Sequence, residues 1–218
     1  MKIVAVVPIK LNSSRLPQKN IKCFTNGEPL CNYILKTLKS IKEIEEVYVY
    51  CSNSDIIDYL PQGVKYLQRS TKLDCDTTKI NDVLYEFVKE IKADVYVMAH
   101  TTAPFIKNKS IEKGLSAIME KKFDSAFSVN KMQDFLWKDG KPFNYDLGDI
   151  PRTQDLEPIY KETSGFYIFR RDIMKNFRKR IGERPYIVEV SEIEGIDIDE
   201  EEDFIIADAI FNYRANLN

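Results

Sequence analysis

The chain has 218 residues, of which 44% are apolar, and its 32 Lys and Arg residues nearly balance its 34 Asp and Glu residues. This length favours a single domain over residues 1–218 with a sizeable core, and the net charge of -2 argues against a protein that coats nucleic acid. The start, Met1-Lys2-Ile3-Val4, is typical of neither a secretory signal nor a membrane span, so we expect a cytoplasmic protein with no membrane partner.

The cysteines are widely spaced, form no C-x-x-C pair and mostly adjoin apolar residues. They are Cys23, Cys31, Cys51 and Cys75. We therefore expect reduced, structural thiols rather than a zinc site.

The N-terminal segment joins an apolar strand, predicted over residues 2–8, to a polar loop, residues 9–20. A buried strand that ends in such a loop is typical of phosphate sites in α/β proteins. The loop offers several cations and donors to a nucleotide triphosphate, namely Lys10, Arg15, Lys19, Asn12, Ser13 and Ser14. It contains neither a Walker motif nor G-x-G-x-x-G, and a polar loop of this kind can also simply face water.

Strands and helices alternate along the rest of the chain, which predicts an α/β fold with a mostly parallel, helix-covered sheet. The expected strands cover residues 47–51, 64–67, 95–99, 125–129, 166–169 and 186–190. The expected helices cover residues 29–41, 54–60, 78–92, 110–121 and 172–180, with a closing helix that ends near Tyr213. Pro29 is suited to open the first helix, and Ser110 to act as the N-cap of the fourth.

Residues 131–162 interrupt this alternation with several glycines and prolines and with scattered aromatic side chains. A loop of this length within a compact domain is usually functional or part of an interface. We predict short strands and loops that project from the sheet to cover substrate or bind a second subunit. Trp137 and the tyrosines are expected in the core or in an interface rather than as platforms for base stacking.

An acidic pair near the C-terminus, Asp197 and Asp199, alternates with isoleucines, so both carboxylates are expected on one face of an extended segment. One or two carboxylates together with substrate phosphates are a common Mg²⁺ site, which predicts a metal next to a nucleotide held by the first loop. A plainer alternative is that Asp199 and Glu202 form a capping box. The acidic run over residues 200–203 is assigned to the start of a helix in either case.

His100 is the only histidine and follows a predicted strand, where α/β sheets place their ligands. A single histidine is more often a hydrogen-bonded structural residue than a catalytic base. We therefore treat His100 as a side chain that lines the site, without a catalytic role.

Together these motifs resemble the CMP-sugar synthetases, above all the acylneuraminate cytidylyltransferases, with a relation to the CMP-Kdo synthetases. In the first loop, Ser13, Leu16, Pro17, Lys19 and Asn20 match the acylneuraminate pattern A-R-x-G-S-K-x-L-P-x-K-N, and Arg15 matches the Kdo branch. The later matches are Arg69 with Asp76-Thr77-Thr78, the segment His100-Thr101-Thr102-Ala103-Pro104-Phe105, residues 152–156 with 164–169, and residues 196–203. Lys10, Ser14 and His100 depart from the pattern, since the family usually has arginine at the first position and glutamine at the last.

The resemblance implies a three-layer, Rossmann-like nucleotidyltransferase that uses Mg²⁺ to join CTP to the anomeric hydroxyl of a 2-keto sugar acid and releases pyrophosphate. It implies catalytic roles for Lys10, Lys19 and Asp199, and Mg²⁺ ligands in Asp197 and Asp199. The implied nucleotide contacts are Leu11, Asn12, Ser13, Ser14, Arg15, Asn20, Arg69 and Thr78. The implied sugar contacts are His100, Thr102, Gln154 and Tyr167. It also implies a homodimer in which residues 131–162 of one subunit reach toward the other's site.

Two alternatives stay open. A metal-dependent glycosyltransferase also uses an Asp-x-Asp pair, although its pair normally follows a strand in the middle of the chain. A catalytically inactive nucleotide-binding homologue would keep the fold while Lys10 and His100 changed. The proton acceptor could be metal-bound water, Asp197 or the substrate itself, and the sequence does not identify the sugar acid.

Overall fold

The computed structural model describes residues 1–12 and 15–216. A seven-stranded sheet forms the centre of this part of the chain. Its strands are β1 (Ile3–Ile9), β2 (Glu46–Cys51), β3 (Lys65–Gln68), β4 (Val95–Ala99), β5 (Ser125–Met132), β8 (Ile159–Arg170) and β9 (Pro185–Glu189). The strand order is β3-β2-β1-β4-β8-β5-β9, and β8 alone among these strands runs antiparallel to its neighbours. The predicted mostly parallel sheet is confirmed.

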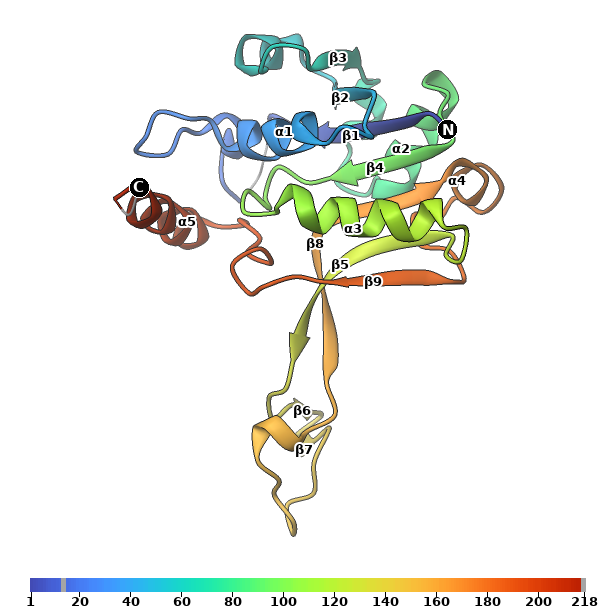
Figure 1. Cartoon of the computed structure of the whole chain (residues 1–218). Coiled ribbons are helices and arrows are strands. Elements are labelled where there is room, and N and C mark those ends of the chain that lie inside the picture. Colours follow the sequence, from blue (N-terminus) through green and yellow to red (C-terminus); the bar gives the residue numbers. More distant parts are fainter. Residues whose placement is uncertain (13–14, 217–218) are drawn as a thin grey trace.

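Helices cover both faces of this sheet, which gives three layers (Figure 1). The helices are α1 (Leu30–Ser40), α2 (Ile80–Glu90), α3 (Asn108–Met119), α4 (Arg171–Phe177) and α5 (Glu201–Ala215). Apolar residues of α1 and α3 pack on one face, and those of α2 and α4 pack on the other. The two layers use alternate residues of β1: Ile3, Ala5 and Val7 face the first, whereas Val4 and Val6 face the second. Burial on both faces explains why β1 is a continuous apolar run.

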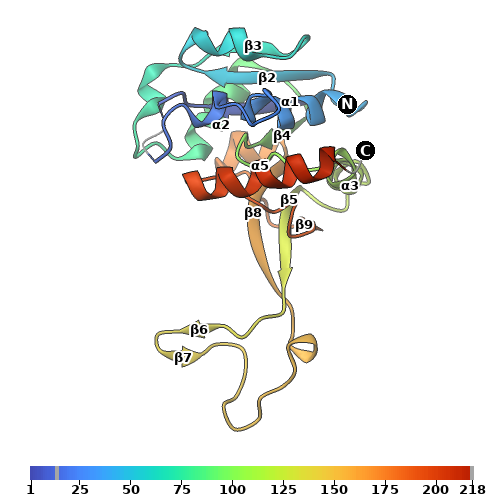
Figure 2. The same cartoon turned by 90° about the vertical axis from the view of Figure 1, so that its left-hand side faces the viewer.

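Helix α5 lies across the carboxyl end of the parallel strands rather than on a face (Figure 2). Its Phe204 ring stacks on Phe24 with 4.4 Å between centroids, and Asp208 accepts hydrogen bonds from the backbone and side chain of Thr25. The first helix residues are capped by a box between Glu200 and Asp203. The C-terminal helix is thereby fixed to the segment that follows the first loop.

The start of α3 is capped differently from its prediction. Helix α3 begins at Asn108 with Lys107 at the N-cap, and Ser110 lies inside its first turn. The Ser110 hydroxyl donates to Glu194, a buried acid from a distant turn that also accepts from the Lys107 backbone N–H. The expected role of Ser110 as N-cap was wrong because a carboxylate far away in the sequence caps this helix.

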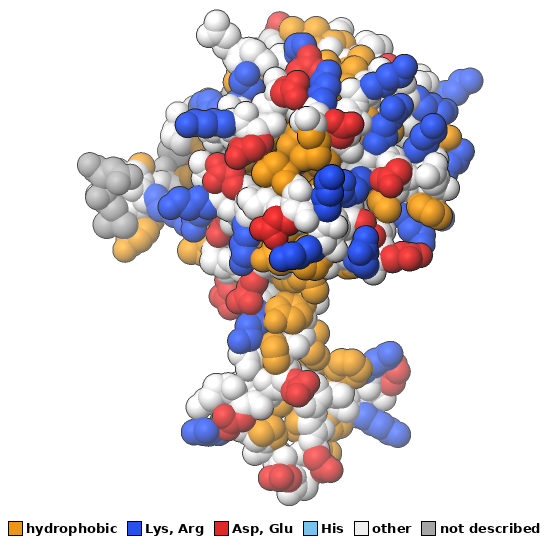
Figure 3. Space-filling model, turned by 45° about the vertical axis from the view of Figure 1, so that its right-hand side comes forward, with side chains coloured by type: hydrophobic (Ala, Val, Ile, Leu, Met, Phe, Trp, Pro, Cys, Tyr) orange, Lys and Arg blue, Asp and Glu red, His pale blue; other side chains and the backbone are white. Residues whose placement is uncertain are grey.

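Residues 131–162 project from the body as an arm, as Figures 1 and 2 show. It contains the end of β5, the small hairpin β6 (Trp137–Lys138) and β7 (Lys141–Pro142), the 3₁₀ turn Thr153–Asp155 and the start of β8. Figure 3 shows hydrophobic side chains gathered along the stem of the arm and on its lobe. The predicted projection is thus seen, and its function in dimerisation stays a prediction.

In residues 1–12 and 15–216 we find no helix that is both long enough and apolar enough to cross a lipid bilayer.

Candidate active site

The site lies where the connections from neighbouring parallel strands diverge. Strands β1 and β4 are adjacent, and the chain continues from β1 toward β2 and β3 but from β4 toward the opposite half of the sheet. Such a switch point at the carboxyl ends of parallel strands is where open α/β sheets bind ligands. Lys10 follows β1, and His100 follows β4, so both predicted site residues lie at this point.

Asn20 connects the loops that follow these two strands. Its side-chain amide donates to the Lys10 carbonyl at 2.7 Å and accepts a hydrogen bond from the Thr101 hydroxyl. The Asn20 side chain is buried, so the two bonds replace contacts that water would otherwise supply. The predicted nucleotide contact of Asn20 stays a prediction, and the geometry shows a residue that positions the two loops.

The basic loop and the acidic pair meet, as their proposed shared site requires. The Lys19 ammonium donates to the Ile198 carbonyl at 2.6 Å and lies 3.2 Å from an Asp199 carboxylate oxygen. Arg15 donates to the same oxygen at 2.9 Å. Lys19 is buried and fixes the acidic segment in place. Arg15 is exposed, so its side chain can turn from Asp199 toward a ligand.

Asp197 and Asp199 both line a cleft of about 540 Å³, whereas Ile198 between them is fully buried. The predicted alternation of the two carboxylates is therefore confirmed. Burial raises the pKa of Asp197, although a hydrogen bond with Thr102 opposes that shift. One carboxylate oxygen of Asp197 is buried and has no hydrogen-bond partner among the described residues.

Asp197 and Asp199 are suitable protein ligands for Mg²⁺. Within residues 1–12 and 15–216 no cluster of three or more His, Cys, Asp or Glu side chains is arranged to hold a metal. Two carboxylates are enough for Mg²⁺ when substrate phosphates and water complete its octahedron. The unpartnered Asp197 oxygen is the donor that such an ion would satisfy.

The capping box that we considered for Asp199 and Glu202 occurs one residue later. The Asp203 carboxylate accepts hydrogen bonds from the backbone N–H groups of both Asp199 and Glu200, at 2.9 Å each, and Glu200 completes the box. Because Asp203 satisfies the backbone at the helix start, the Asp199 side chain is left to face the cleft and the two cations. The capping explanation therefore applies to Glu200 and Asp203 and not to Asp199.

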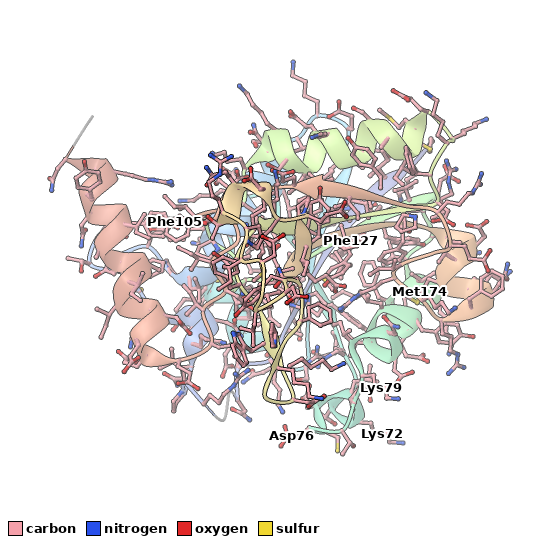
Figure 4. The ribbon with its side chains drawn as sticks, turned by 90° about the horizontal axis from the view of Figure 1, so that it is seen from below. Lys72, Asp76, Lys79, Phe105, Phe127 and Met174 are labelled. Atoms are coloured by element: carbon pink, nitrogen blue, oxygen red, sulfur yellow. The ribbon has the colours of Figure 1, made fainter. Side chains whose placement is uncertain are left out.

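Lys10 does not join this cluster. Its ammonium pairs with Asp76 at 2.7 Å, on the segment that precedes α2. Seen from below, Asp76 lies together with Lys72 and Lys79, well away from Phe105 beside α5 (Figure 4). The structure therefore gives Lys10 a partner on the α2 side of the site rather than Asp199, and its predicted contact with the triphosphate stays a prediction.

Four further loop positions complete the first motif. Leu11 packs on the core beside α1, and Asn12 is exposed. Ser13 and Ser14 lie outside the described residues. The nucleotide contacts predicted for these four residues stay predictions.

Arg69 and Thr78 lie on the α2 side of the site. Arg69 is only 4% exposed and donates to Asp74 at 2.5 Å, and a second nitrogen of its guanidinium, Nε, is buried without a hydrogen-bond partner among the described residues. Thr78 closes the turn before α2 through its backbone N–H. A direct contact of Arg69 with a nucleotide would require the Arg69–Asp74 pair to open.

Two of the residues predicted to contact the sugar, His100 and Thr102, follow β4. The Thr102 carbonyl accepts from the Ile198 backbone N–H at 2.8 Å, which ties the end of β4 to the acidic pair. Burial, aided by the nearby charges of Arg180 and Lys19, lowers the pKa of His100 to about 4. His100 is therefore neutral near pH 7 and can line the site without adding a positive charge.

Tyr167 is a core residue whose hydroxyl reaches the site. Its side chain is 1% exposed, and its hydroxyl donates to Glu162, which lines the cleft. Burial raises the pKa of Tyr167 to about 12, so the phenol stays protonated. Direct contact between its ring and a sugar is not what this packing favours, because Arg180 lies over the ring.

Gln154 lies on the 3₁₀ turn Thr153–Asp155 in the arm, which extends away from the body that holds the cleft (Figure 1). Its carbonyl accepts a hydrogen bond from Gln133, another arm residue. The expectation that Gln154 lines the sugar side is therefore not met within one chain. Gln154 could line the cleft only if the arm of a second copy reached it.

Several residues of the cleft were missed from the sequence. Lys161, Glu162 and Ser164 line it, but the first two fell in the range assigned to the arm. Ser164 adopts a left-handed conformation, with φ at 57°, directly before Gly165, where a Cβ would meet Ile106 at 2.6 Å. The Ser-Gly pair at a strand bulge was the signal that could have indicated this wall.

A helix-covered, mostly parallel sheet with cations and carboxylates paired at its carboxyl edge defines a nucleotide-binding α/β protein of the nucleotidyltransferase type. The family model for cytidylyltransferases matches residues 4–215, and the chain belongs to this family. The resemblance found in the motifs is confirmed at this level.

The relatives agree with this family. The chain is 25% identical over 216 residues to N-acylneuraminate cytidylyltransferase A of Danio rerio, covering 94% of the chain and 50% of that relative. It is 23% identical over 198 residues to 3-deoxy-manno-octulosonate cytidylyltransferase of Escherichia coli, covering 81% of the chain and 75% of that relative. The chain spans about half the length of the acylneuraminate cytidylyltransferases that it matches.

A solved structure of CMP:2-keto-3-deoxy-manno-octonic acid synthetase complexed with CTP has the same fold. The TM-score is 0.75 at 20% sequence identity, and the match covers 98% of this chain and 100% of that one. At this identity the likeness establishes the fold alone.

Proposed function

We propose that this chain transfers CMP from CTP to the anomeric hydroxyl of a 2-keto sugar acid, a sialic-acid-like nonulosonic acid, with release of pyrophosphate. The observation that carries the proposal is the contact of Arg15 and Lys19 with Asp199 beside the open cleft. Cations for a triphosphate and carboxylates for a metal are brought together there by segments from opposite ends of the chain. Membership of the cytidylyltransferase family supports the choice of CTP.

The chemistry at the α-phosphorus requires positioning and charge neutralisation more than covalent help from the protein. The hydroxyl gives up its proton to a carboxylate of the site or of the substrate, and its oxygen forms a bond to the α-phosphorus while the bond from that phosphorus to the bridging oxygen of pyrophosphate breaks. Arg15 exchanges its contact with Asp199 for the triphosphate, and the buried Lys19 holds the acidic segment in register with the first loop.

Asp197 and Asp199 would hold Mg²⁺, which when bound stabilises the charge that develops on the phosphates. Asp197 presents its unpartnered oxygen, and Asp199 becomes available as Arg15 turns to the nucleotide. His100, which follows β4 and is neutral near pH 7, lines the acceptor's part of the site without adding a positive charge.

The arm supports a homodimer as part of this proposal. It exposes large apolar side chains, among them Trp137 at 57% and Ile150 at 60%, which a second copy would cover. The same assembly would bring Gln154 of one arm toward the cleft of the other copy.

The test is an assay of pyrophosphate release with CTP, Mg²⁺ and a panel of sialic, legionaminic, pseudaminic and Kdo-type acids. Release with CTP and one of these acids, and none with ATP, is the expected result. Turnover only with a sugar nucleotide and an acceptor would instead identify a glycosyltransferase. No turnover with any of these mixtures, together with CTP binding, would identify an inactive nucleotide-binding homologue.

A further inference from the structure

Arg180 comes from the segment after α4 and lies beside Glu162, which lines the cleft. Its guanidinium carbon lies 3.9 Å from the centroid of the Tyr167 ring, and one of its nitrogens lies 3.7 Å from Glu162, a residue of the cleft wall. Its charge also acts on His100 at the end of β4. The two contacts place this cation against β8, beside the wall of the cleft.

The surroundings fix the plane of the guanidinium but leave its donors available. A guanidinium that stacks on an aromatic ring directs its N–H groups outward at its edges. Within residues 1–12 and 15–216 the Arg180 side chain donates no hydrogen bond, and the Glu162 oxygen is too far for one. The side chain is 21% exposed, so a small ligand in the cleft can reach it.

The remaining cations of the site have other partners. Lys10 pairs with Asp76, and Arg15 and Lys19 pair with Asp199. Lys161 also lines the cleft, but it is an exposed, unstacked side chain. Among these cations of the described chain, Arg180 is the one that is both held in place and supplied with free planar donors.

We propose that Arg180 binds the carboxylate of the sugar acid and so sets the specificity of this chain for acidic acceptors. The inference rests on the proposed function and adds the residue that recognises the acceptor's charge. The planar fork of arginine matches the two oxygens of a carboxylate, and the binding replaces the long ion pair with Glu162.

The stack on Tyr167 explains why a core tyrosine contributes to acceptor binding without touching the acceptor. The Tyr167 hydroxyl donates to Glu162, and the Tyr167 ring supports Arg180. The ring of Phe127 stacks in turn beside Tyr167, with 6.2 Å between centroids, and Figure 4 shows Phe127 between Phe105 and Met174. The Arg180 guanidinium is therefore supported by two stacked aromatic rings of the sheet, Tyr167 and Phe127.

The experiment measures steady-state kinetics of Arg180→Gln with the sugar acid that the wild-type chain uses and with the amide made from its carboxyl group. We expect the KM for the acid to rise about 10- to 100-fold, as for loss of a charged hydrogen-bonded contact, while the KM for CTP is unchanged. The wild-type preference for the acid over the amide should disappear in the variant. Lys179→Gln removes the same charge from the neighbouring exposed position and should change neither constant.

Equal losses for acid and amide in Arg180→Gln would overturn the assignment, and so would a loss of the preference in Lys161→Gln instead. If Arg180→Gln does not fold, Glu162→Gln tests the same point with Arg180 intact. Removing the competing carboxylate should lower the KM for the acid, and a raised or unchanged KM would contradict the proposal. A wild-type chain that releases no pyrophosphate with any sugar acid would refute the proposed function itself, which is a different result.

Discussion

Lys19 donates to the backbone carbonyl of Ile198 at 2.6 Å, across a sequence separation of 179 residues. This bond fixes the main chain between the two acidic residues directly to the basic loop. The side chains on either side of Ile198 are thereby aimed into the cleft.

Replacing Asp199 by Asn should reduce pyrophosphate release by a factor on the order of 100 or more, because the variant loses a metal ligand and a charge at the reacting phosphates. Thermal unfolding should change little, since Asp203 and Glu200 rather than Asp199 cap α5. Glu202→Gln, an exposed change in the same acidic run, is the matched control and should keep full activity. Normal turnover by Asp199→Asn would contradict the metal assignment.

Mg²⁺ alone should stabilise the protein very little, whereas Mg²⁺ with CTP should raise the unfolding temperature clearly. The reason is that the protein supplies two carboxylates, Asp197 and Asp199, and Asp199 is paired with Arg15 and Lys19. Asp199 becomes free to bind the metal only when the phosphates of CTP take its place beside Arg15. Differential scanning fluorimetry with Mg²⁺, CTP, both and neither measures this. A large shift with Mg²⁺ alone would show a preformed metal site.

Replacing Asn20 by Ala should lower the free energy of unfolding by about 2–4 kcal/mol, since two buried hydrogen bonds between the strand-end loops are lost. Asn176→Ala, on an exposed position of α4, is the control and should be nearly neutral. Urea unfolding of both variants gives the two values. Equal stabilities would mean that Asn20 does not connect the loops.

Protonation of His100 should make the protein less stable in acid. Burial lowers the pKa of His100 to about 4, from the ordinary value of 6.5, so between these values the unfolded chain binds more protons than the folded one. The His100 contribution is therefore fully present above pH 6.5 and lost as the pH falls toward 4, by about 3 kcal/mol in total. Comparing urea unfolding of the wild type and His100→Gln across this range isolates the term, and identical pH profiles would refute it.

The arm should hold two copies together. We expect static light scattering at micromolar concentration to give twice the mass of the chain, and Trp137→Asp combined with Leu147→Asp to give the mass of one chain. Both side chains are more than half exposed in the single chain. Ile205→Asp, an equally exposed apolar position on α5, is the control. A wild-type mass of one chain would rule out the dimer.

Much of the fold could be predicted because its strands are buried on both faces and so appear as apolar runs. The acidic pair was found because Ile198 must face the core, which sends Asp197 and Asp199 to the other side. Arg180 could not be found in this way, since its place depends on a ring that is 13 positions earlier in the chain and on a turn after α4. Likewise, nothing near Ser110 indicates that Glu194 caps α3.

The stacking of Phe204 on Phe24 joins the helix that follows the acidic pair to the segment that follows the basic loop. The Phe211 ring adds contacts with Phe24 and Phe105, so an aromatic cluster holds α5 across the strand ends instead of within a layer. Partial detachment of this helix would therefore separate the carboxylates from the cations while the sheet stayed intact. In hydrogen exchange, α5 amides should slow markedly when CTP and Mg²⁺ bind, because the ligand bridges the parts that the aromatic stack holds together.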